Sequence, residues 1–415
     1  MGQIWYVSGW LLASLFLLGV GGCSPSAGNR TDDAPVTTTE EEGRDATATV
    51  PATQTALPPT ATTTPTETPT PPPPPAQAMY RGNLQRTGAT GAEEAPRALT
   101  GVAWQFETES EVHSSPVAAD GVVYFGSDDQ HLYAVDLETG AEIWRSKLVG
   151  KIFSTPAVVD GVVYVGAQGI YALDAASGEE LWHFQPGFSA FEASPAVVDG
   201  VVYVAGQDGR LYALDGTTGA LLWEMEAGGP ILSSPAVAGD RIYLGTEIGD
   251  LYAVDRAQGE PVWKREVVRG IYATAAVAGE WLYIGDLDGT FYALDRETGE
   301  EVWQLRTGKP FVSSAAVAGD MVYIGNLDHH VYALDRKTGD EVWRFETGHE
   351  VYSSPTVAGD TVYVGSDDGS LYALDAATGE ELWHYETGGF VGSAPGVADG
   401  IVLVGSYDGR VYGLH

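Results

Sequence analysis

The sequence has 415 residues and a formal net charge of −36, from 57 acidic against 21 basic residues. Because so acidic a chain repels phosphate backbones, composition argues against nucleic-acid binding. The single cysteine, Cys23, excludes an intrachain disulfide and a cysteine-rich metal site.

Residues 1–22 are interpreted as a signal peptide. Residues 10–20 form an apolar run too short to span a bilayer comfortably, and Gly21, Gly22 and Cys23 follow. Small residues before a cysteine resemble the lipobox of bacterial lipoproteins, which implies cleavage before Cys23 and lipidation of it. Residues 1–9 lack the Lys or Arg typical of such signals. The alternative is an uncleaved anchor helix over residues 4–22, and both interpretations predict export and tethering.

Residues 23–78 are predicted to form a lipid-anchored, disordered stalk. They are rich in Thr, Pro, Ala and acids, so they offer little to bury against chain entropy. The proline-rich end predicts an extended spacer, with a ligand for another protein's domain as the alternative. Residues 79–101 are then an entry segment to the folded domain, residues 102–415.

A tryptophan recurs along the folded domain at spacings of 40, 38, 41, 40, 40, 40 and 40 residues. The set is Trp104, Trp144, Trp182, Trp223, Trp263, Trp303, Trp343 and Trp383. Seven units share the pattern Tyr-Ala-Leu/Val-Asp-x-x-Thr/Ser/Gln-Gly-x-x-x-Trp. A steady period of this length is typical of repeat architectures.

Each repeat predicts a four-stranded antiparallel sheet. Its hydropathy alternates with period two, in runs such as SSPTVA, TVYVGS, SLYALDA and ELWHYET. The first two runs are joined either by Asp-Gly, which suits a type I′ turn, or by Gly-acid, which suits type II′. In the Asp-x-x-Thr-Gly turn, the Asp carboxylate is expected to accept local backbone N–H bonds.

Side-chain size predicts how the sheets are arranged. First strands carry Ser, Ala, Thr, Pro and Val, whereas third and fourth strands carry Tyr, Leu and Trp. Sheets around an axis have less room near it, so this taper favours an eight-bladed β-propeller, with an open solenoid as the alternative. Trp104 has no strands of its own before it and the last repeat lacks its Trp strand. Residues 102–107 are therefore expected to complete the C-terminal blade and close the ring.

The repeated motif resembles that of the pyrroloquinoline-quinone-like propeller superfamily, and residues 79–88 resemble its entry segment. The resemblance implies that the eight tryptophans dock between neighbouring blades. The superfamily includes quinone-dependent dehydrogenases and non-catalytic members such as BamB-type envelope lipoproteins, which scaffold outer-membrane protein assembly. Anchor, blade number and repeat favour the non-catalytic branch, although BamB-type proteins generally lack a long Thr/Pro stalk.

An enzyme is not expected. The resemblance implies that a dehydrogenase would hold quinone and Ca²⁺ with Glu, Asn and Asp on long insertions, often beside a vicinal cysteine pair. Here the repeats differ in length by at most three residues and the ring has no cysteine. Asparagine is scarce, since Asn83 precedes the ring and Asn326 lies in a turn. The histidines are scattered, and acidic stretches at 285–289 and 366–370 read as hairpin turns. We expect no catalytic residue, metal or cofactor.

Comparison of the repeats points to a binding face. One position before the first strand varies sharply while its surroundings repeat, and the loop before it varies too. It holds His113, Phe153, Glu192, Leu232, Tyr272, Val312, Tyr352 and Gly392. Gln130 and His329 replace a glycine in turns expected on the same face. These residues are the candidate face near one channel mouth, with relaxed constraint on surface loops as the alternative explanation.

The resulting hypothesis is a monomeric, membrane-anchored, non-enzymatic propeller that binds envelope or surface proteins on the extracytoplasmic side of the outer or only membrane. A receptor for a glycan or small molecule is the alternative, and a quinone-dependent dehydrogenase comes third.

Overall fold

The computed structural model of the protein describes residues 78–90 and 96–415. The predicted signal peptide, Cys23 and residues 24–77 of the predicted stalk lie outside the described residues. Within these two ranges, no helix is long and apolar enough to cross a bilayer.

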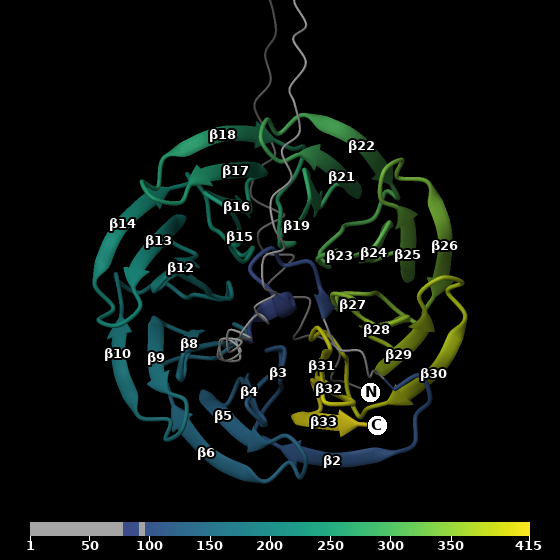
Figure 1. Cartoon of the computed structure of the whole chain (residues 1–415), viewed down its shortest axis with the longest axis horizontal. Coiled ribbons are helices and arrows are strands. Elements are labelled where there is room, and N and C mark those ends of the chain that lie inside the picture. The colour runs from purple at the N-terminus through teal and green to yellow at the C-terminus, as the bar shows by residue number, and fades with distance from the viewer. Residues whose placement is uncertain (1–77, 91–95) are drawn as a thin grey trace, which may run out of the picture. The chain divides into compact units, whose positions relative to one another are not determined.

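Eight sheets stand in a ring around a central axis, which confirms the predicted all-β, eight-bladed propeller (Figure 1). Seven sheets have four strands and the other gains β1 (Ala89–Thr90) as a fifth. From the axis outward, blades 1 to 4 are β3 (Val117–Ala119), β4 (Val122–Gly126), β5 (His131–Asp136) and β6 (Glu142–Lys147); β7 (Ala157–Val159), β8 (Val162–Gly166), β9 (Ile170–Asp174) and β10 (Glu180–Phe184); β11 (Ala196–Val198), β12 (Val201–Ala205), β13 (Arg210–Asp215) and β14 (Leu221–Glu226); β15 (Ala236–Ala238), β16 (Arg241–Gly245), β17 (Asp250–Asp255) and β18 (Pro261–Glu266).

Blades 5 to 8 follow the same order, and the last takes its outer strand from the start of the domain. They are β19 (Ala276–Ala278), β20 (Trp281–Gly285), β21 (Thr290–Asp295) and β22 (Glu301–Arg306); β23 (Ala316–Ala318), β24 (Met321–Gly325), β25 (His330–Asp335) and β26 (Glu341–Glu346); β27 (Thr356–Ala358), β28 (Thr361–Gly365), β29 (Ser370–Asp375) and β30 (Glu381–Glu386); β31 (Gly396–Ala398), β32 (Ile401–Ser406), β33 (Arg410–Leu414) and β2 (Val102–Glu107).

The ring closes through β2, as the sequence predicted. β2 pairs antiparallel with β33, with Trp104 opposite Gly413 and Glu107 opposite Arg410. The C-terminal residue is also held, because the Gly101 amide donates to the His415 carbonyl at 2.9 Å. The first and last segments of the domain therefore share one sheet (Figure 1).

The turns adopt the predicted geometries. Asp120 and Gly121 both have positive φ, 51° and 76°, as a type I′ turn requires. In the Gly239–Asp240 turn the glycine has φ 61°, as expected at the first central position of type II′. In the turn between the third and fourth strands of blade 1, Asp136 Oδ1 accepts hydrogen bonds from the backbone amide and the hydroxyl of Thr139 at 2.9 and 2.6 Å. These bonds favour the carboxylate and lower the pKa of Asp136.

The first strands are shorter than predicted. The run SSPTVA in blade 7 indicated a strand from Ser353, but β27 begins at Thr356. The serines leave the ladder because their polar groups bond across to the next blade: the Ser353 hydroxyl donates to the Ser393 carbonyl at 2.8 Å. Pro355 has no N–H to offer a ladder.

A belt of hydrogen bonds to hydroxyl groups links the inner edges of the blades. The Ser115 amide donates to Thr155 Oγ1 at 3.2 Å, and the Ala394 amide donates to Ser115 Oγ at 2.9 Å. Equivalent bonds run from Thr155 to Ser194, Ser194 to Ser234, Ser234 to Thr274, Thr274 to Ser314 and Ser314 to Ser354. Ala394 has no hydroxyl to continue the belt from Ser354, whose own hydroxyl lies 3.3 Å from that of Tyr80.

At the outer edge, indoles reach from each blade to the next. Trp104 Nε1 donates to the Leu137 carbonyl at 2.7 Å, and its ring lies against Gly140. That glycine has φ 68°, and a Cβ there would lie 2.7 Å from the indole, so both its conformation and its size matter. Trp383 has no eighth turn of this kind to meet, because blade 8 lacks it, and donates instead to the Pro96 carbonyl at 3.1 Å. Between the two edges, each apolar cluster joins residues of two adjacent blades.

The entry segment lies inside the ring. The short 3₁₀ helix Tyr80–Gly82 and β1 occupy the centre of the view (Figure 1). The amides of Val237, Val277, Val317 and Val357 donate to its carbonyls, and that of Val158 donates to the carbonyl of Ala78 just before it, all at 2.7 to 2.9 Å, so the inward segment begins one residue earlier than predicted. Inner strands are edge strands with free backbone groups, and the segment satisfies five of them.

Two arginines of this segment are buried in the ring. Arg86 donates from Nε to the Pro235 carbonyl at 3.1 Å and from Nη2 to the Pro195 carbonyl at 2.7 Å. Arg81 donates to the carbonyls of Ala315 and Pro355 on the far blades. Burial lowers the pKa of Arg86 to about 9 and that of Arg81 to about 10. Carbonyls at the inner edges of four blades thus replace water around two guanidinium groups.

Replacing Trp104 by alanine should destabilise the closed ring by about 3–5 kcal/mol, because it leaves a cavity and an unpaired carbonyl between blades 8 and 1. Val102→Ala is the matched control, since Val102 lies in the same strand and is 44% exposed. Urea unfolding measures both variants. Equal midpoints for the two would contradict the role given to the indole.

Candidate functional site

The variable positions surround one mouth of the channel. Each is half-buried and follows a fully buried apolar residue, as Phe153 follows Ile152 and Tyr272 follows Ile271. The alternation places one side chain in the blade interface and the next toward the channel. We call this end of the channel, with the loops between blades and the turns between second and third strands, the mouth face.

A second ring on the mouth face was missed by the sequence interpretation. It is the second residue of each turn between second and third strands: Asp128, Gln168, Gln207, Glu247, Leu287, Leu327, Asp367 and Tyr407. In seven blades its amide donates to the carbonyl two residues before the variable position, as Asp128 does to Glu111 at 3.0 Å and Asp367 to Glu350 at 3.0 Å. The same comparison of repeats could have found this ring, because its residue types vary as much.

An arc of rings runs along the mouth face from blade 6 to blade 2. Its centroid separations are 5.4 Å for His329–His349, 6.4 Å for His349–Phe390 and 6.1 Å for Phe390–Tyr407. It continues over 4.0 Å from Tyr407 to His113 and 4.9 Å from His113 to Phe153. Aromatic faces offer apolar area with a negative quadrupole, which suits aromatic, apolar or cationic partners.

Acidic groups lie around His113, the member of this arc that belongs to blade 1. His113 Nε2 lies 3.1 Å from Glu111 Oε2 and 3.6 Å from Asp128 Oδ2. Lys151 Nζ lies 2.6 Å from the same Asp128 oxygen and 5.8 Å over the Phe153 ring. The histidine that the sequence treated as isolated is therefore part of a charged cluster.

On blades 3 to 5 the acids are held by neutral donors. Gln207 Nε2 donates to Glu192 Oε1 at 2.7 Å, and the Tyr272 hydroxyl donates to Glu247 Oε1 at 2.9 Å. Burial, reinforced by the charges of Glu247 and Asp128, raises the pKa of Glu192. Burial and the bond to Glu247 raise the pKa of Tyr272. This sector is acidic and largely paired within the chain.

Blade 7 carries a second carboxylate pair at the positions of Glu111 and Asp128. Burial and the charge of Glu350, with a smaller contribution from Asp368, raise the pKa of Asp367 from its ordinary 3.8 to about 7. Burial and the charges of Glu350 and Asp367 raise the pKa of Tyr352 to about 12. A carboxyl group with such a pKa lacks a compensating cation.

The remaining predicted residues have smaller parts. Leu232 and Val312 are half-buried at their ring positions and add apolar surface. His329 joins the arc, whereas Gln130 is an exposed turn residue outside it. Both adopt positive φ, 73° and 75°, at the position that other blades give to glycine.

Two groups on the mouth face could hold a cation. Ligand atoms of Glu111, His113 and Asp128 lie within 4.8 Å of one another, and so do those of His349, Glu350 and Asp367. In the first group Lys151 already occupies an Asp128 oxygen. Carboxylate and imidazole donors suit a divalent metal or an organic cation.

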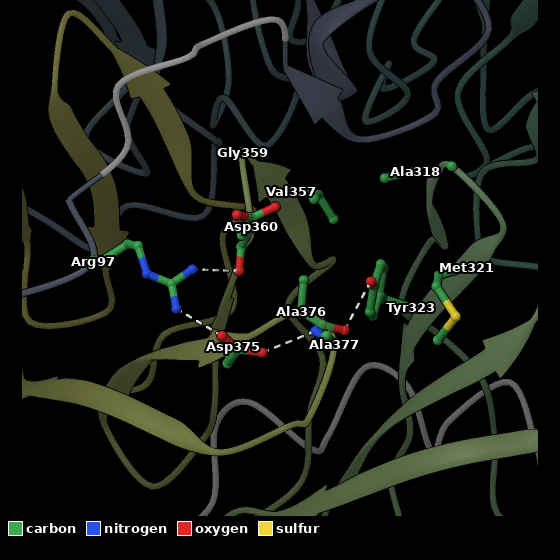
Figure 2. Close-up of a pocket in the computed structure, with 11 residues that line it drawn as sticks. Arg97, Ala318, Met321, Tyr323, Val357, Gly359, Asp360, Asp375, Ala376 and Ala377 are labelled. Atoms are coloured by element: carbon green, nitrogen blue, oxygen red, sulfur yellow. Dashed lines mark hydrogen bonds and ion pairs between the residues drawn. The ribbon is translucent and has the colours of Figure 1, made fainter.

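A pocket of about 730 Å³ opens on the opposite face, between the turns of blades 6 and 7 (Figure 2). Arg97 Nη2 lies 2.6 Å from Asp375 Oδ2, and Nη1 donates to the Asp360 carbonyl at 3.2 Å. The bond from Arg97 and those of its own turn lower the pKa of Asp375. Because this carboxylate belongs to the repeated turn motif, the pocket lacks the variation seen on the mouth face.

Four overlapping stretches, residues 97–185, 166–266, 247–354 and 327–415, match the sequence profile of the family described as outer membrane protein assembly factor BamB. The chain belongs to this family. The predicted pyrroloquinoline-quinone-like repeat is confirmed with it.

Solved structures agree with the BamB-family fold. BamB from Moraxella catarrhalis superimposes with a TM-score of 0.67 at 20% identity, over 76% of this chain and 99% of that one. The quinohemoprotein alcohol dehydrogenase of Comamonas testosteroni reaches 0.71 at 19% identity, over 81% of this chain and 80% of the enzyme. At such identities the likeness concerns the fold alone.

Part of the sequence also matches a curated protein that is an enzyme. Tetrathionate hydrolase of Acidithiobacillus ferrooxidans is 27% identical over 144 residues, which cover 28% of this chain and 28% of that protein. The BamB-family chain thus matches just over a quarter of this relative's length.

The mouth face does not fit pyrroloquinoline quinone. The quinone carries three carboxylates, which would meet the acids of both rings, among them Glu192, Glu247 and Asp367. Asn326, which lies in a turn of blade 6, has its amide committed: Nδ2 donates to the Lys309 and Pro310 carbonyls at 2.9 and 3.1 Å, and Oδ1 accepts the Asp328 amide. The described donors therefore suit a cation better than an anionic cofactor.

Asp367→Asn should stabilise the protein at pH 8 but not at pH 4. Because the pKa of Asp367 is raised in the folded state, its favourable contribution to the free energy of unfolding is fully present below about pH 4 and is lost as the pH rises through about 7. The side-chain amide introduced by Asp367→Asn does not ionise, so the variant does not lose this stability at high pH. The difference in thermal midpoint between variant and wild type, at the two pH values, measures this effect.

Asp240→Asn is the control, since Asp240 is exposed. A shift from Asp367→Asn that is the same at pH 4 and pH 8 would disprove the raised pKa.

Proposed function

We propose that the protein is a membrane-anchored, non-enzymatic propeller that binds protein partners in the cell envelope through its mouth face. The observation that carries this proposal is the arc of rings from His329 to Phe153, set on positions that vary while the rest of each blade repeats. The blades supply rigidity, and the mouth face supplies the chemistry of recognition.

The composition of the mouth face supports a protein partner. Exposed apolar side chains gather on its loops and turns, with Phe188 exposed to 94%. The others are Val149, Ile248, Val268 and Phe390. Aromatic and apolar anchors beside charged groups are typical of the residues that contribute most to protein–protein binding. The description of the BamB family, as an assembly factor of outer-membrane proteins, favours the same class.

Anchoring is part of the proposal. Residues 1–22 would be removed, Cys23 would carry the lipid, and residues 24–78 would hold the propeller away from the outer or only membrane. A tether of this kind raises the local concentration of the mouth face near membrane-bound partners.

The alternative is a receptor for a glycan, which the arc itself favours because sugar rings stack on aromatic faces. The two functions differ in what survives loss of aromatic side chains from the mouth face. A protein partner yields a discrete cross-linked species, whereas a glycan receptor yields binding to an isolated oligosaccharide.

Replacing Phe153, Tyr272 and Tyr352 together by alanine should abolish a discrete cross-linked partner in intact cells, because it removes three side chains of the mouth-face ring. Val262, Val302 and Val342, exposed on outer strands, provide the matched triple-alanine control. Cross-linking of membranes and binding to a glycan array are measured in parallel, and the thermal midpoint of each variant verifies folding.

Loss of the cross-linked species in the mouth-face variant alone supports the scaffold. Unaltered cross-links together with lost glycan binding would replace it by the glycan receptor.

The full-length protein should not oxidise alcohols in a dye-linked assay after addition of pyrroloquinoline quinone and Ca²⁺, because the acidic mouth face repels the cofactor. Robust, quinone-dependent turnover would refute the non-enzymatic assignment.

A further inference from the structure

The mouth face contains one example of cation binding within the chain. Lys151, from the loop entering blade 2, places Nζ 2.6 Å from Asp128 Oδ2 of blade 1 and 5.8 Å over the Phe153 ring. The Asp128 side chain is 2% exposed, so this ion pair replaces the water contacts that burial removes. Its Oδ1 atom still has no hydrogen-bond partner among the described residues.

Blade 7 repeats the acids of blade 1 without the lysine. Glu350 and Asp367 stand at the positions of Glu111 and Asp128, but Phe390 stands at the position of Lys151. Among the described residues, neither Glu350 nor Asp367 takes part in an ion pair, whereas Asp128 does. Burial and then the charge of Glu350 raise the pKa of Asp367, and no ion pair among the described residues offsets them.

Aromatic rings adjoin this second carboxylate pair, beginning with His349, a ring nitrogen of which lies within 4.8 Å of both carboxylates. Phe390 lies between His349 and Tyr407, at 6.4 and 6.1 Å. Tyr407 belongs to blade 8, between the carboxylate pairs of blades 7 and 1, and burial followed by the charges of Asp367, Glu111 and Asp128 raises its pKa. Carboxylates beside aromatic faces are the usual surroundings of bound guanidinium and ammonium groups.

We propose that Glu350 and Asp367 bind the guanidinium or ammonium group of an Arg or Lys side chain from an extended basic segment of the partner. The inference rests on the proposed function, because it names the chemistry of the partner that the mouth face binds. The partner's cation takes the place at blades 7 and 8 that Lys151 takes at blades 1 and 2.

The rings favour an organic cation over a metal ion. His349, Glu350 and Asp367 can converge on a metal, with ligand atoms within 4.8 Å of one another. A small, strongly hydrated ion gains little from the neighbouring Phe390 and Tyr407 faces, whereas a guanidinium stacks on them while its N–H groups bond the carboxylates. Metal binding is nevertheless a separate outcome of the test.

The decisive variant is Phe390→Lys, which gives blade 7 the lysine that blade 1 has. The new side chain should pair with Asp367 and so occupy the site from within. The probe is a fluorescent peptide of alternating serine and arginine, titrated at pH 8 into the full-length protein in detergent and followed by anisotropy. Phe390→Lys should weaken binding about tenfold or more, as should the double variant Glu350→Gln/Asp367→Asn.

Two controls separate this site from general attraction to an acidic protein. Leu222→Lys adds the same charge at an exposed position of the outer strand β14, and Glu346→Gln/Glu386→Gln removes the same two charges from outer strands. Both controls should bind the peptide as the wild type does. Phe390→Lys should also raise the thermal midpoint at pH 8, which shows that the variant folds and that its lysine is paired.

Several results would overturn the inference. They are unchanged peptide binding by Phe390→Lys, equal binding of a serine–glutamine peptide, or saturable binding of Ca²⁺ or Zn²⁺ at Glu350 and Asp367 without any binding of the peptide. If the mouth-face alanine variant loses its cross-linked partner while Phe390→Lys still binds the peptide, the scaffold stands and the basic segment fails. If the peptide behaves as expected but the triple alanine variant of the mouth face keeps its cross-linked partner, the proposed scaffold function of this face fails instead.

Discussion

Contact between neighbouring blades is the constraint on which the structure depends. Every sheet must be narrow at the axis and wide at the rim, and it must attach to the next sheet along its whole depth. The hydrogen bond from Ser115 to Thr155 represents the inner attachment and the bond from Trp104 to Leu137 the outer one. Apolar clusters fill the space between them. Because the same contacts recur around the circle, the same residues recur in the sequence.

That constraint also explains which residues are free to differ. A side chain facing the channel mouth takes no part in the repeated inner, outer and apolar contacts that hold neighbouring blades together, so His113, Glu192 and Tyr352 can occupy one position in three blades without changing the fold. The ring therefore divides its residues between two tasks, blade contact and recognition. The entry segment adds to the first task, since Arg81 and Arg86 hold the inner strands of distant blades together.

The sequence predicted the fold well because its signals are local and repeated. The tryptophan period, the hairpin turns and the unpaired Trp104 strand were enough to predict eight blades and their closure. The candidate site was harder. Position in the repeat located His113 and Phe153, but nothing local indicated that Tyr407 lies 4.0 Å from His113, because the two are joined only by ring closure.

Other features depend on contacts that no periodic pattern reveals. The shorter first strands follow from hydroxyl bonds to another blade, and the entry segment enters the channel although its sequence suggests only a connection. The contrast between Lys151 and Phe390 is present in the sequence, yet it gains meaning only when Asp128 and Asp367 are seen to face those positions. Charge pairing across blades is a property of the closed ring.

The most direct measurement is site-specific photo-cross-linking in intact cells, with a benzoylphenylalanine at position 352 on the mouth face or at position 342 on the outer rim. Val342 is 53% exposed, whereas Tyr352 is half-buried, so accessibility alone favours the rim. Recognition through the mouth face predicts a discrete protein adduct from position 352 and none from position 342. Adducts from position 342 alone would contradict it.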